Sequence, residues 1–146
     1  MISTLTKDET THLIHGPVGK LEVLVSEFTD EERSAWGIIC HPHSLFGGSM
    51  HNKVVTTLAK TFQGLGVNTV RFNFRGVGES QGVYDKGEGE LSDAAAALDW
   101  MQALNPNAPF VWVAGFAFGS WIGMQLLMRR PEIKGFVAVS PPANEI

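Results

Sequence analysis

Three short segments carry the residues that could do chemistry. The first holds His41 and His43 and, a little further on, His51. Histidines at short spacing are typical zinc ligands, and a histidine near a carboxylate such as Asp85 can act as a general base. Pro42 disturbs the same-face geometry of a His-x-His pair, however, and apart from one cysteine in an apolar run no carboxylate or cysteine stands at a supporting interval. We therefore expect no metal ion in this segment.

The second segment, Arg75-Gly76-Val77-Gly78-Glu79-Ser80, begins like a dinucleotide-binding fingerprint. That fingerprint needs a third glycine at position 81, which is Gln81, and an acidic residue about twenty residues later at the end of a second strand. The sequence supplies neither, so we expect no nucleotide and no other cofactor. The glycines more simply allow a turn that brings Arg75 and Ser80 to the carboxyl edge of a sheet, near a pocket.

The third segment contains Gly115-Phe116-Ala117-Phe118-Gly119-Ser120 between an apolar run and residues with helical spacing. This pattern predicts a buried strand that turns sharply, with glycines where backbones approach closely, and then winds into a helix. Ser120 is the nearby hydroxyl, but it lies about one helical turn, roughly 4.5 Å along the axis, deeper than the turn. We expect this hydroxyl to bond the Phe116 carbonyl or to pack against the sheet, and not to act as a nucleophile.

The periodicity of the rest of the chain predicts the elements that position these segments. An antiparallel pair at a sheet edge is followed by strands and helices in alternation, which indicates parallel strands with helices on both faces. Asp85 is expected to cap or precede the second helix. The expected strands are 10–14, 20–25, 37–40, 67–73, the run that ends near residue 116, and 135–140; the expected helices are 54–65, with Gly66 as its stop, 90–104, and one that closes at 129–131.

Composition limits the classes of function. The 146 residues are expected to form one domain, 1–146, with a formal net charge of -4 and with Lys and Arg scattered, which argues against nucleic acid as a partner. The sequence has no apolar run long enough to span a membrane, so we expect no membrane partner, and its opening residues do not resemble a secretion signal. The single cysteine, Cys40, lies in an apolar run and is expected to pack as a small hydrophobic residue in a reducing, cytoplasmic setting.

From Trp36 to Pro142 the chain resembles the small bacterial α/β-hydrolases related to dienelactone hydrolases and carboxylesterases. Four motifs carry the resemblance in the same order along the chain, each after a predicted strand. They are His41-Pro42-His43-Ser44-Leu45-Phe46-Gly47-Gly48, Arg71-Phe72-Asn73-Phe74-Arg75-Gly76-Val77-Gly78-Glu79-Ser80, the turn around Ala117, and Val139-Ser140-Pro141-Pro142. The resemblance implies the α/β-hydrolase fold and a serine nucleophile in the turn.

The resemblance also assigns roles to residues by position. Ala117 occupies the place of the nucleophile, and the backbone N–H groups of Phe118 and of Leu45, or its neighbour Phe46, would stabilise the oxyanion. Two fixed N–H dipoles, one at a helix N-terminus, suit that role and do not depend on side chains. The expected pocket residues are His41, His43, Phe46, Arg75, Ser80 and Phe116, with the histidines shaping and hydrogen-bonding the oxyanion loop.

The sequence departs from the family pattern in two places. The usual Gly-Phe-Ser-Phe-Gly-Ala of the turn reads Gly-Phe-Ala-Phe-Gly-Ser here, and a methyl group cannot form an acyl-enzyme. The acid and the histidine of the family's triad follow the strand that here ends at Ser140, so we expect the C-terminal strands of the fold to be missing.

These observations leave three functions open. The resemblance implies esterase-type hydrolysis of a small ester or lactone by a serine mechanism that is impaired in the chain as written. The alternatives are a binding module that retains the pocket without catalysis, and a fragment that assembles, as a homo-oligomer for example, through the apolar edge strand Phe136-Val137-Ala138-Val139.

Overall fold

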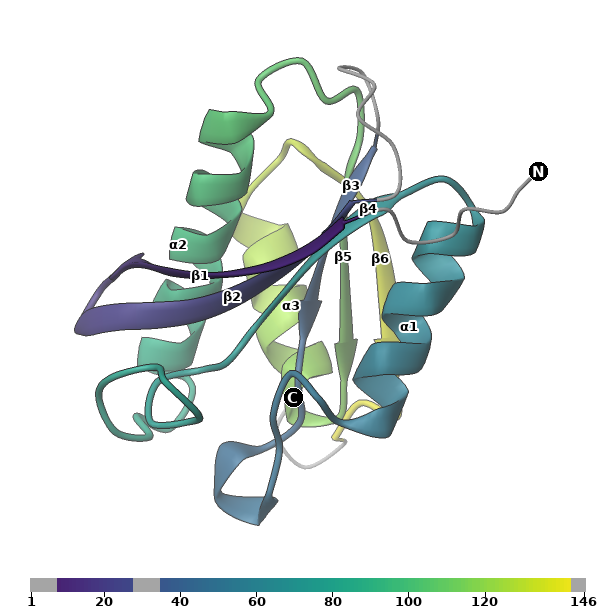
Figure 1. Cartoon of the computed structure of the whole chain (residues 1–146). Coiled ribbons are helices and arrows are strands. Elements are labelled where there is room, and N and C mark those ends of the chain that lie inside the picture. The colour runs from purple at the N-terminus through teal and green to yellow at the C-terminus, as the bar shows by residue number, and fades with distance from the viewer. Residues whose placement is uncertain (1–7, 28–34, 143–146) are drawn as a thin grey trace.

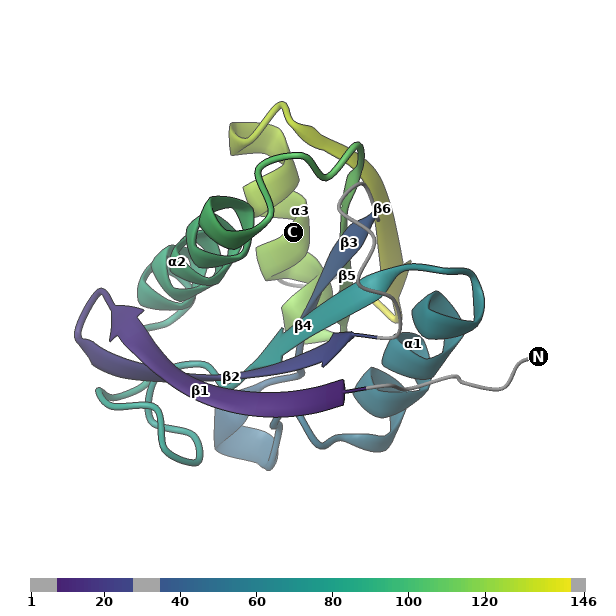
Figure 2. The same ribbon diagram turned by 45° about the horizontal axis from the view of Figure 1, so that its top comes forward.

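A computed structural model, which describes residues 8–27 and 35–142, contains one six-stranded sheet flanked by helices (Figures 1 and 2). The strands lie in the order β1-β2-β4-β3-β5-β6. The pairs β1–β2 and β2–β4 are antiparallel, and the pairs β4–β3, β3–β5 and β5–β6 are parallel. This is the predicted α/β fold. The elements are β1 (Asp8–Gly16), β2 (Gly19–Glu27), β3 (Trp36–Cys40), a 3-10 turn η1 (Ser44–Phe46), α1 (Lys53–Gly64), β4 (Asn68–Phe72), α2 (Glu88–Leu104), β5 (Val111–Phe116), α3 (Phe118–Arg129) and β6 (Ile133–Val139).

The antiparallel pair predicted at one edge is the hairpin of β1 and β2. Its strands extend the expected ranges at both ends, because pairing continues to Gly16 and Gly19 at the turn and to Asp8 and Glu27 at the far end. The second helix begins at Glu88, two residues before the predicted start. The Glu90 carboxylate accepts hydrogen bonds from the backbone N–H groups of Gly87, at 2.8 Å, and Asp85, at 2.9 Å, and so fixes the helix start. Asp85 precedes α2, as expected.

The helices form two layers, one on each face of the sheet. Helices α2 and α3 cover one face and α1 covers the other, as Figure 2 shows most clearly. The larger core lies under α2 and α3, where β4 contributes Val70 and Phe72 and α2 contributes Leu98, all with no exposed surface. A smaller core under α1 is built from Ile39, Val55, Ala59, Phe62 and Ala114. Helices on both faces were predicted, and the two cores explain why the central strands β3 and β5 are apolar on both sides.

The carboxyl ends of β3, β4 and β5 meet at one edge of the sheet, so that their loops lie together. Two hydrogen bonds tie the loop after β3 to the loop after β4. The backbone N–H of Phe74 donates to His41 Nε2 at 3.0 Å, and the N–H of Met50 donates to Asn73 Oδ1 at 2.8 Å. The three motifs singled out in the sequence are therefore held at this edge.

Cys40, the last residue of β3, is fully buried, and loss of hydration raises the pKa of its thiol to about 12. The thiol is therefore protonated and packs as a small hydrophobic group, as predicted. Within residues 8–27 and 35–142, no helix is both long and apolar enough to cross a bilayer.

Candidate active site at the β5–α3 turn

Ala117 stands alone between the end of β5 and the start of α3, with φ 55° and ψ −120°. A residue with a Cβ atom in this region of φ and ψ is strained, at a cost of order 1–3 kcal/mol. The turn is held from one side, because the Ala117 N–H donates to the Val139 carbonyl of β6 at 2.9 Å. The side chain is half-buried at the apex of the turn, not inside an element.

Two glycines allow the turn to pack against its neighbours. A Cβ atom at Gly119 would come within 2.1 Å of the Cys40 carbonyl oxygen at the end of β3, and one at Gly115 within 2.3 Å of the Gly119 carbonyl oxygen. Both contacts involve backbone, which cannot move away easily. Gly119 is therefore required by the close approach of the turn to the end of β3, and Gly115 by the close approach of β5 to the first turn of α3, in agreement with the sequence analysis.

Phe118 is the first residue of α3, and its N–H points out of the helix start, where such groups lack an intrahelical acceptor. Among the described residues, no hydrogen bond from this N–H is observed. Its side chain is buried against the rings of Phe74, at a centroid distance of 5.8 Å, and of His43, at 4.9 Å. A backbone donor is therefore held rigidly beside Ala117, available to an anion.

Ser120 is buried, with 1% of its surface exposed. Its Oγ donates to the Gly115 carbonyl at 2.7 Å and lies 3.1 Å from the Val139 carbonyl oxygen. The predicted acceptor, the Phe116 carbonyl, was wrong by one residue, because the tight turn carries the chain back over Gly115. The hydroxyl ties β5 to β6 and is not exposed to a substrate. Phe116 itself is half-buried at the end of β5.

His41 is fully buried and has both ring nitrogens engaged. Its Nδ1 lies 2.6 Å from the Pro42 carbonyl oxygen, and its Nε2 accepts the Phe74 N–H. Loss of hydration lowers the pKa of this imidazole to about 4, outweighing the bond to Pro42, which acts in the opposite direction. The ring is therefore neutral and braces two loops, so it has no free nitrogen with which to act as a base.

His43 lies closer to the turn. It precedes the 3-10 turn η1, and its Nδ1 accepts the Leu45 N–H at 3.1 Å, while the Phe46 N–H donates to the His43 carbonyl at 3.1 Å. Both backbone groups predicted as oxyanion donors on this loop are thus engaged within the loop. The His43 ring contacts the rings of Phe46, Tyr84 and Phe118 at centroid distances of 4.7 to 4.9 Å. Leu45 and Phe46 have exposed side chains.

Arg75 is directed into the fold, in place of the predicted pocket position. Its backbone N–H and Nε donate to Asp93 Oδ2, at 2.9 and 3.1 Å, and Nη2 donates to Asp93 Oδ1 at 3.0 Å. Nη2 also donates to the Gly89 carbonyl, and Nη1 lies 3.9 Å from an Asp85 oxygen. The hydrogen bonds that the Arg75 side chain donates to the Asp93 carboxylate are the main cause that raises the pKa of Arg75. A His43–Asp85 base is not formed, because Asp85 faces Arg75.

Ser80 is also used inside the fold. Its Oγ donates to the Asn73 carbonyl at 2.6 Å and accepts the Glu22 N–H at 2.9 Å, so it ties the loop to β2 and lies away from β5. A Cβ atom at Gly78 would lie 2.5 Å from Asn73 Nδ2 and 2.6 Å from Glu22 Oε1. The φ of 54° at Gly78 also favours glycine, so the turn conformation and these contacts account for the residue without a phosphate. Of the predicted pocket residues, the structure gathers His43 and Phe46 with Phe118 near Ala117, whereas Arg75 and Ser80 are separated from it.

Sequence reasoning missed three residues of this region. Asp93, in the first turns of α2, is the partner of Arg75; Asn73 links two loops; Tyr84 packs against His43. No local spacing could have identified these contacts, which are all made between separate elements. Among the described residues, no group of three or more His, Cys, Asp or Glu side chains gathers as metal ligands do.

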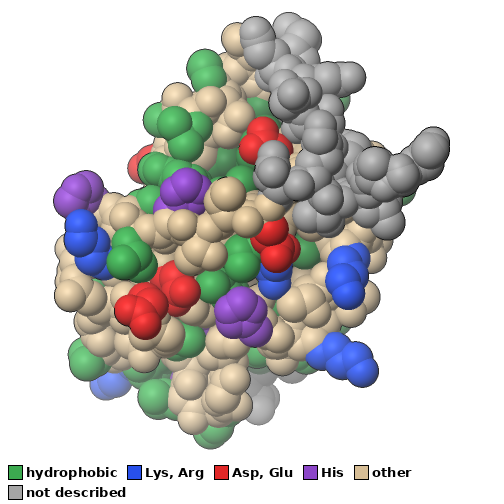
Figure 3. All heavy atoms as spheres, viewed as in Figure 1, with side chains coloured by type: hydrophobic (Ala, Val, Ile, Leu, Met, Phe, Trp, Pro, Cys, Tyr) green, Lys and Arg blue, Asp and Glu red, His purple; other side chains and the backbone are tan. Residues whose placement is uncertain are grey.

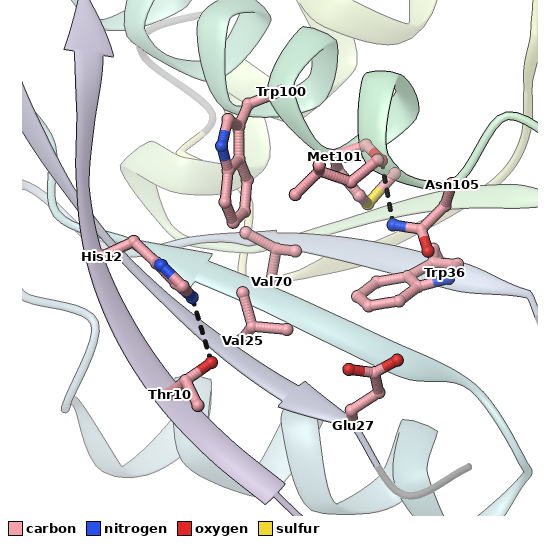
Figure 4. Close-up of a pocket in the computed structure, with 10 residues that line it drawn as sticks. Thr10, His12, Val25, Glu27, Trp36, Val70, Trp100, Met101 and Asn105 are labelled. Atoms are coloured by element: carbon pink, nitrogen blue, oxygen red, sulfur yellow. Dashed lines mark hydrogen bonds between the residues drawn. The ribbon is translucent and has the colours of Figure 1, made fainter. Parts of the chain in front are cut away.

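A cavity of about 360 Å³ lies at the opposite end of the molecule, where β3 begins and α2 ends (Figure 4). Trp36 and Trp100 form its walls, and the rim residues Thr10 and His12 hydrogen-bond to each other at 3.0 Å. The His12 ring packs against the Trp100 ring, with 5.2 Å between the ring centroids. These rim groups already have partners in the protein, and the cavity is remote from Ala117.

Comparison with known proteins places this geometry in a family. A sequence model described as the alpha/beta hydrolase fold matches residues 38–146. An uncharacterised protein of Rickettsia prowazekii is 49% identical over 132 residues, which make up 90% of this chain and 55% of that protein. A crystal structure of a protein of unknown function from Agrobacterium tumefaciens is 50% identical, with a TM-score of 0.88, over 94% of this chain and 62% of that one.

A structure described as an alpha-beta serine hydrolase homologue from Coxiella burnetii is 48% identical, with a TM-score of 0.86, over 92% of this chain and 64% of that chain. The chain therefore spans between 55% and 64% of the length of these three relatives.

Proposed function

This chain belongs to the family of proteins with the alpha/beta hydrolase fold, and from that premise we propose that it binds small esters or lactones at the β5–α3 turn without cleaving them. The proposal assigns the nucleophile position of an esterase to Ala117 and the oxyanion site to the Phe118 N–H. Because the methyl group of Ala117 cannot attack a carbonyl, no acyl-enzyme forms at this position. The site is then of esterase type but inactive as written.

One observation carries the proposal. Ala117 keeps a strained backbone, with φ 55° and ψ −120°, although alanine gains nothing from that conformation. Strain of this kind persists where the surrounding structure imposes it, and it clusters at functional sites. Beside it the Phe118 N–H has no acceptor among the described residues, which suits a ligand oxygen.

The second oxyanion donor is the less accessible part of the site. The Leu45 N–H donates to His43 Nδ1, so a ligand oxygen would have to replace the imidazole as its acceptor. The segment around η1 has two exposed apolar side chains, Leu45 and Phe46, and its backbone hydrogen bonds are made within the loop. A shift of this short turn on ligand binding would free the N–H.

Binding is tested by calorimetric titration of the chain with a short-chain aryl ester, the matching carboxylate and a lactone. We expect saturable binding of the ester or lactone and no release of product. A chain with no affinity for any of the three ligands, or with measurable turnover as written, would contradict the proposal.

The chemistry is tested by Ala117→Ser in a chain extended to the length of its relatives. Restoring the hydroxyl should raise the hydrolysis rate of the aryl ester by about three orders of magnitude or more. Ser120→Ala in the same background is the control, because the Ser120 hydroxyl is buried and bonded to Gly115; it should leave the gained activity in place. If Ser120→Ala abolishes the gained activity, the nucleophile is the Ser120 hydroxyl and not the one introduced at position 117, which would contradict the proposal.

A second candidate function, self-assembly, is favoured by β6. This strand is the edge of the described sheet and pairs with β5 alone. Val137 of β6 also lines an apolar cavity of about 330 Å³ with residues of α1 and β5, among them Leu58 and Trp112. An unpaired apolar edge of this kind associates readily with a second copy. Light scattering would detect a dimer, and a monodisperse monomer at high concentration would argue against it.

A further inference from the structure

Arg71 is the residue before the last of β4 and faces α1, away from the larger core. Side chains alternate along a strand, so Val70 and Phe72 point into the core under α2 and α3 while Arg71 points to the other side. Only 6% of Arg71 is exposed. A buried guanidinium needs hydrogen-bond partners for its N–H groups, because it has lost its water.

The partners of Arg71 in the protein are incomplete. Nη1 donates to the Met50 carbonyl at 3.0 Å, and Nη2 donates to Glu9 Oε2 at 3.3 Å. Nε is buried and has no partner among the described residues. The Nε–Nη2 edge, which fits two oxygens of one anion, is therefore used by a single long bond to a carboxylate whose side chain is 50% exposed.

A cavity opens beside this guanidinium. It has a volume of about 330 Å³, and its remaining walls come from α1, β2 and the segment before α1; they are Leu24, His51, Thr56, Ala59, Lys60 and Gln63, together with Glu9 on β1. Figure 3, in the orientation of Figure 1, shows basic side chains over α1 with a histidine and acidic side chains on the neighbouring surface. Two cations, Arg71 and Lys60, thus face one carboxylate. Loss of hydration lowers the pKa of Arg71, and Glu9 only partly offsets it.

We propose that this cavity binds a small tetrahedral oxyanion, inorganic phosphate or the phosphoryl group of a monoester, through the Nε–Nη2 edge of Arg71 and the ammonium of Lys60. A phosphate dianion matches the two cations, and its oxygens supply the acceptor that Nε lacks. Glu9 can release Nη2 without losing all its contacts, because Ser26 Oγ already donates to the same carboxylate oxygen at 3.1 Å. The site lies on the α1 face and does not depend on Ala117.

The experiment follows the Arg71 Nε–H resonance by ¹⁵N–¹H NMR while sodium phosphate is added, with sodium chloride at matched ionic strength as the reference. We expect a saturable shift with phosphate alone. Glycerol 3-phosphate is the second probe: a shift at lower concentration than with inorganic phosphate would identify a monoester as the ligand, and a weaker one would identify the free ion. Tighter binding of acetate than of either phosphate would overturn the proposal.

Two lysines of α1 give a matched pair of variants. Lys60 lines the cavity, whereas Lys53 is exposed at the start of the same helix and does not line it. Lys60→Gln should weaken phosphate binding by about two- to fivefold, the range of an exposed ion pair, and Lys53→Gln should leave it unchanged. Equal effects of the two variants would mean general screening and would overturn the site.

The arginine itself is tested by Arg71→Lys, which keeps the charge but removes the two-nitrogen edge and should abolish saturable binding. If that variant does not fold, Glu9→Gln tests the same contact by changing the carboxylate that accepts from Arg71 Nη2. Removing the competing carboxylate should tighten phosphate binding, and a weakening would overturn the proposed contact with Nη2.

Discussion

Arg75 and Arg71 are both buried and lie only four positions apart, yet the fold treats them differently. Arg75 meets both oxygens of the fully buried Asp93 and a helix carbonyl, so its guanidinium is held inside the fold. Arg71 meets one half-exposed carboxylate at 3.3 Å and keeps one N–H without a described partner. Arg75 is therefore a polar group that stabilises the fold, whereas Arg71 still has an N–H group with which it can donate to a ligand.

The largest expected effect comes from breaking the Arg75 pair. Asp93→Asn removes the charge that compensates a buried guanidinium, and loss of one partner of such a pair typically costs about 3–5 kcal/mol. We expect the free energy of unfolding, measured with urea, to fall by that amount. A loss below about 1 kcal/mol would mean that water reaches Arg75 and that it is no better held than Arg71.

This pair also marks the limit of what the sequence could predict. The alternation of strands and helices follows from hydrophobic periodicity, so the fold and most element positions were predicted within about two residues. The turn at Ala117 was predicted because its glycines are local. Asp93 stands eighteen residues from Arg75 and on another element, and no local pattern distinguishes a helix-start carboxylate from the partner of a buried arginine.

Two histidines of one motif sharpen the same comparison. His41 has both ring nitrogens bonded in the interior, whereas His43 is half-buried among aromatic rings. Burial lowers the pKa of His41 from 6.5 to about 4, so between these values the unfolded chain binds a proton that the folded chain does not. The free energy of unfolding should therefore fall as the pH falls from 6.5 to 4, by up to about 3 kcal/mol from this residue.

Urea unfolding between pH 4 and 7 tests this expectation, with His41→Gln and His43→Gln as a matched pair. His41→Gln should flatten the pH dependence in that window, although its stability at pH 7 is lower because two hydrogen bonds change. His43→Gln should keep the slope of the unsubstituted chain. If His41→Gln leaves the slope unchanged, His41 takes up its proton in the folded chain as readily as in the unfolded chain, and the expectation is wrong.

A smaller effect is expected from the strain at Ala117. Ala117→Gly relieves the positive φ but adds flexibility to the unfolded chain, so the net gain in stability should be about 0.5–1 kcal/mol. Ala114→Gly is the control, because Ala114 is fully buried inside β5 and has no positive φ; it should destabilise the protein. Thermal unfolding of the two variants gives the comparison. If both variants lose stability, the turn stores no strain.

The smallest effect is expected from Glu9→Gln, the counterpart of Asp93→Asn. Glu9 is half-exposed on the edge strand and reaches Arg71 through one long bond, so water and salt already screen the pair. The variant should change the free energy of unfolding by less than about 1 kcal/mol, and less still in high salt. A loss as large as that of Asp93→Asn would mean that Arg71 depends on Glu9 as Arg75 depends on Asp93. The Arg71–Glu9 pair would then be part of what stabilises the fold, and phosphate could not displace Glu9 from Nη2. The unpartnered Nε–H of Arg71 would in that case not indicate a binding site.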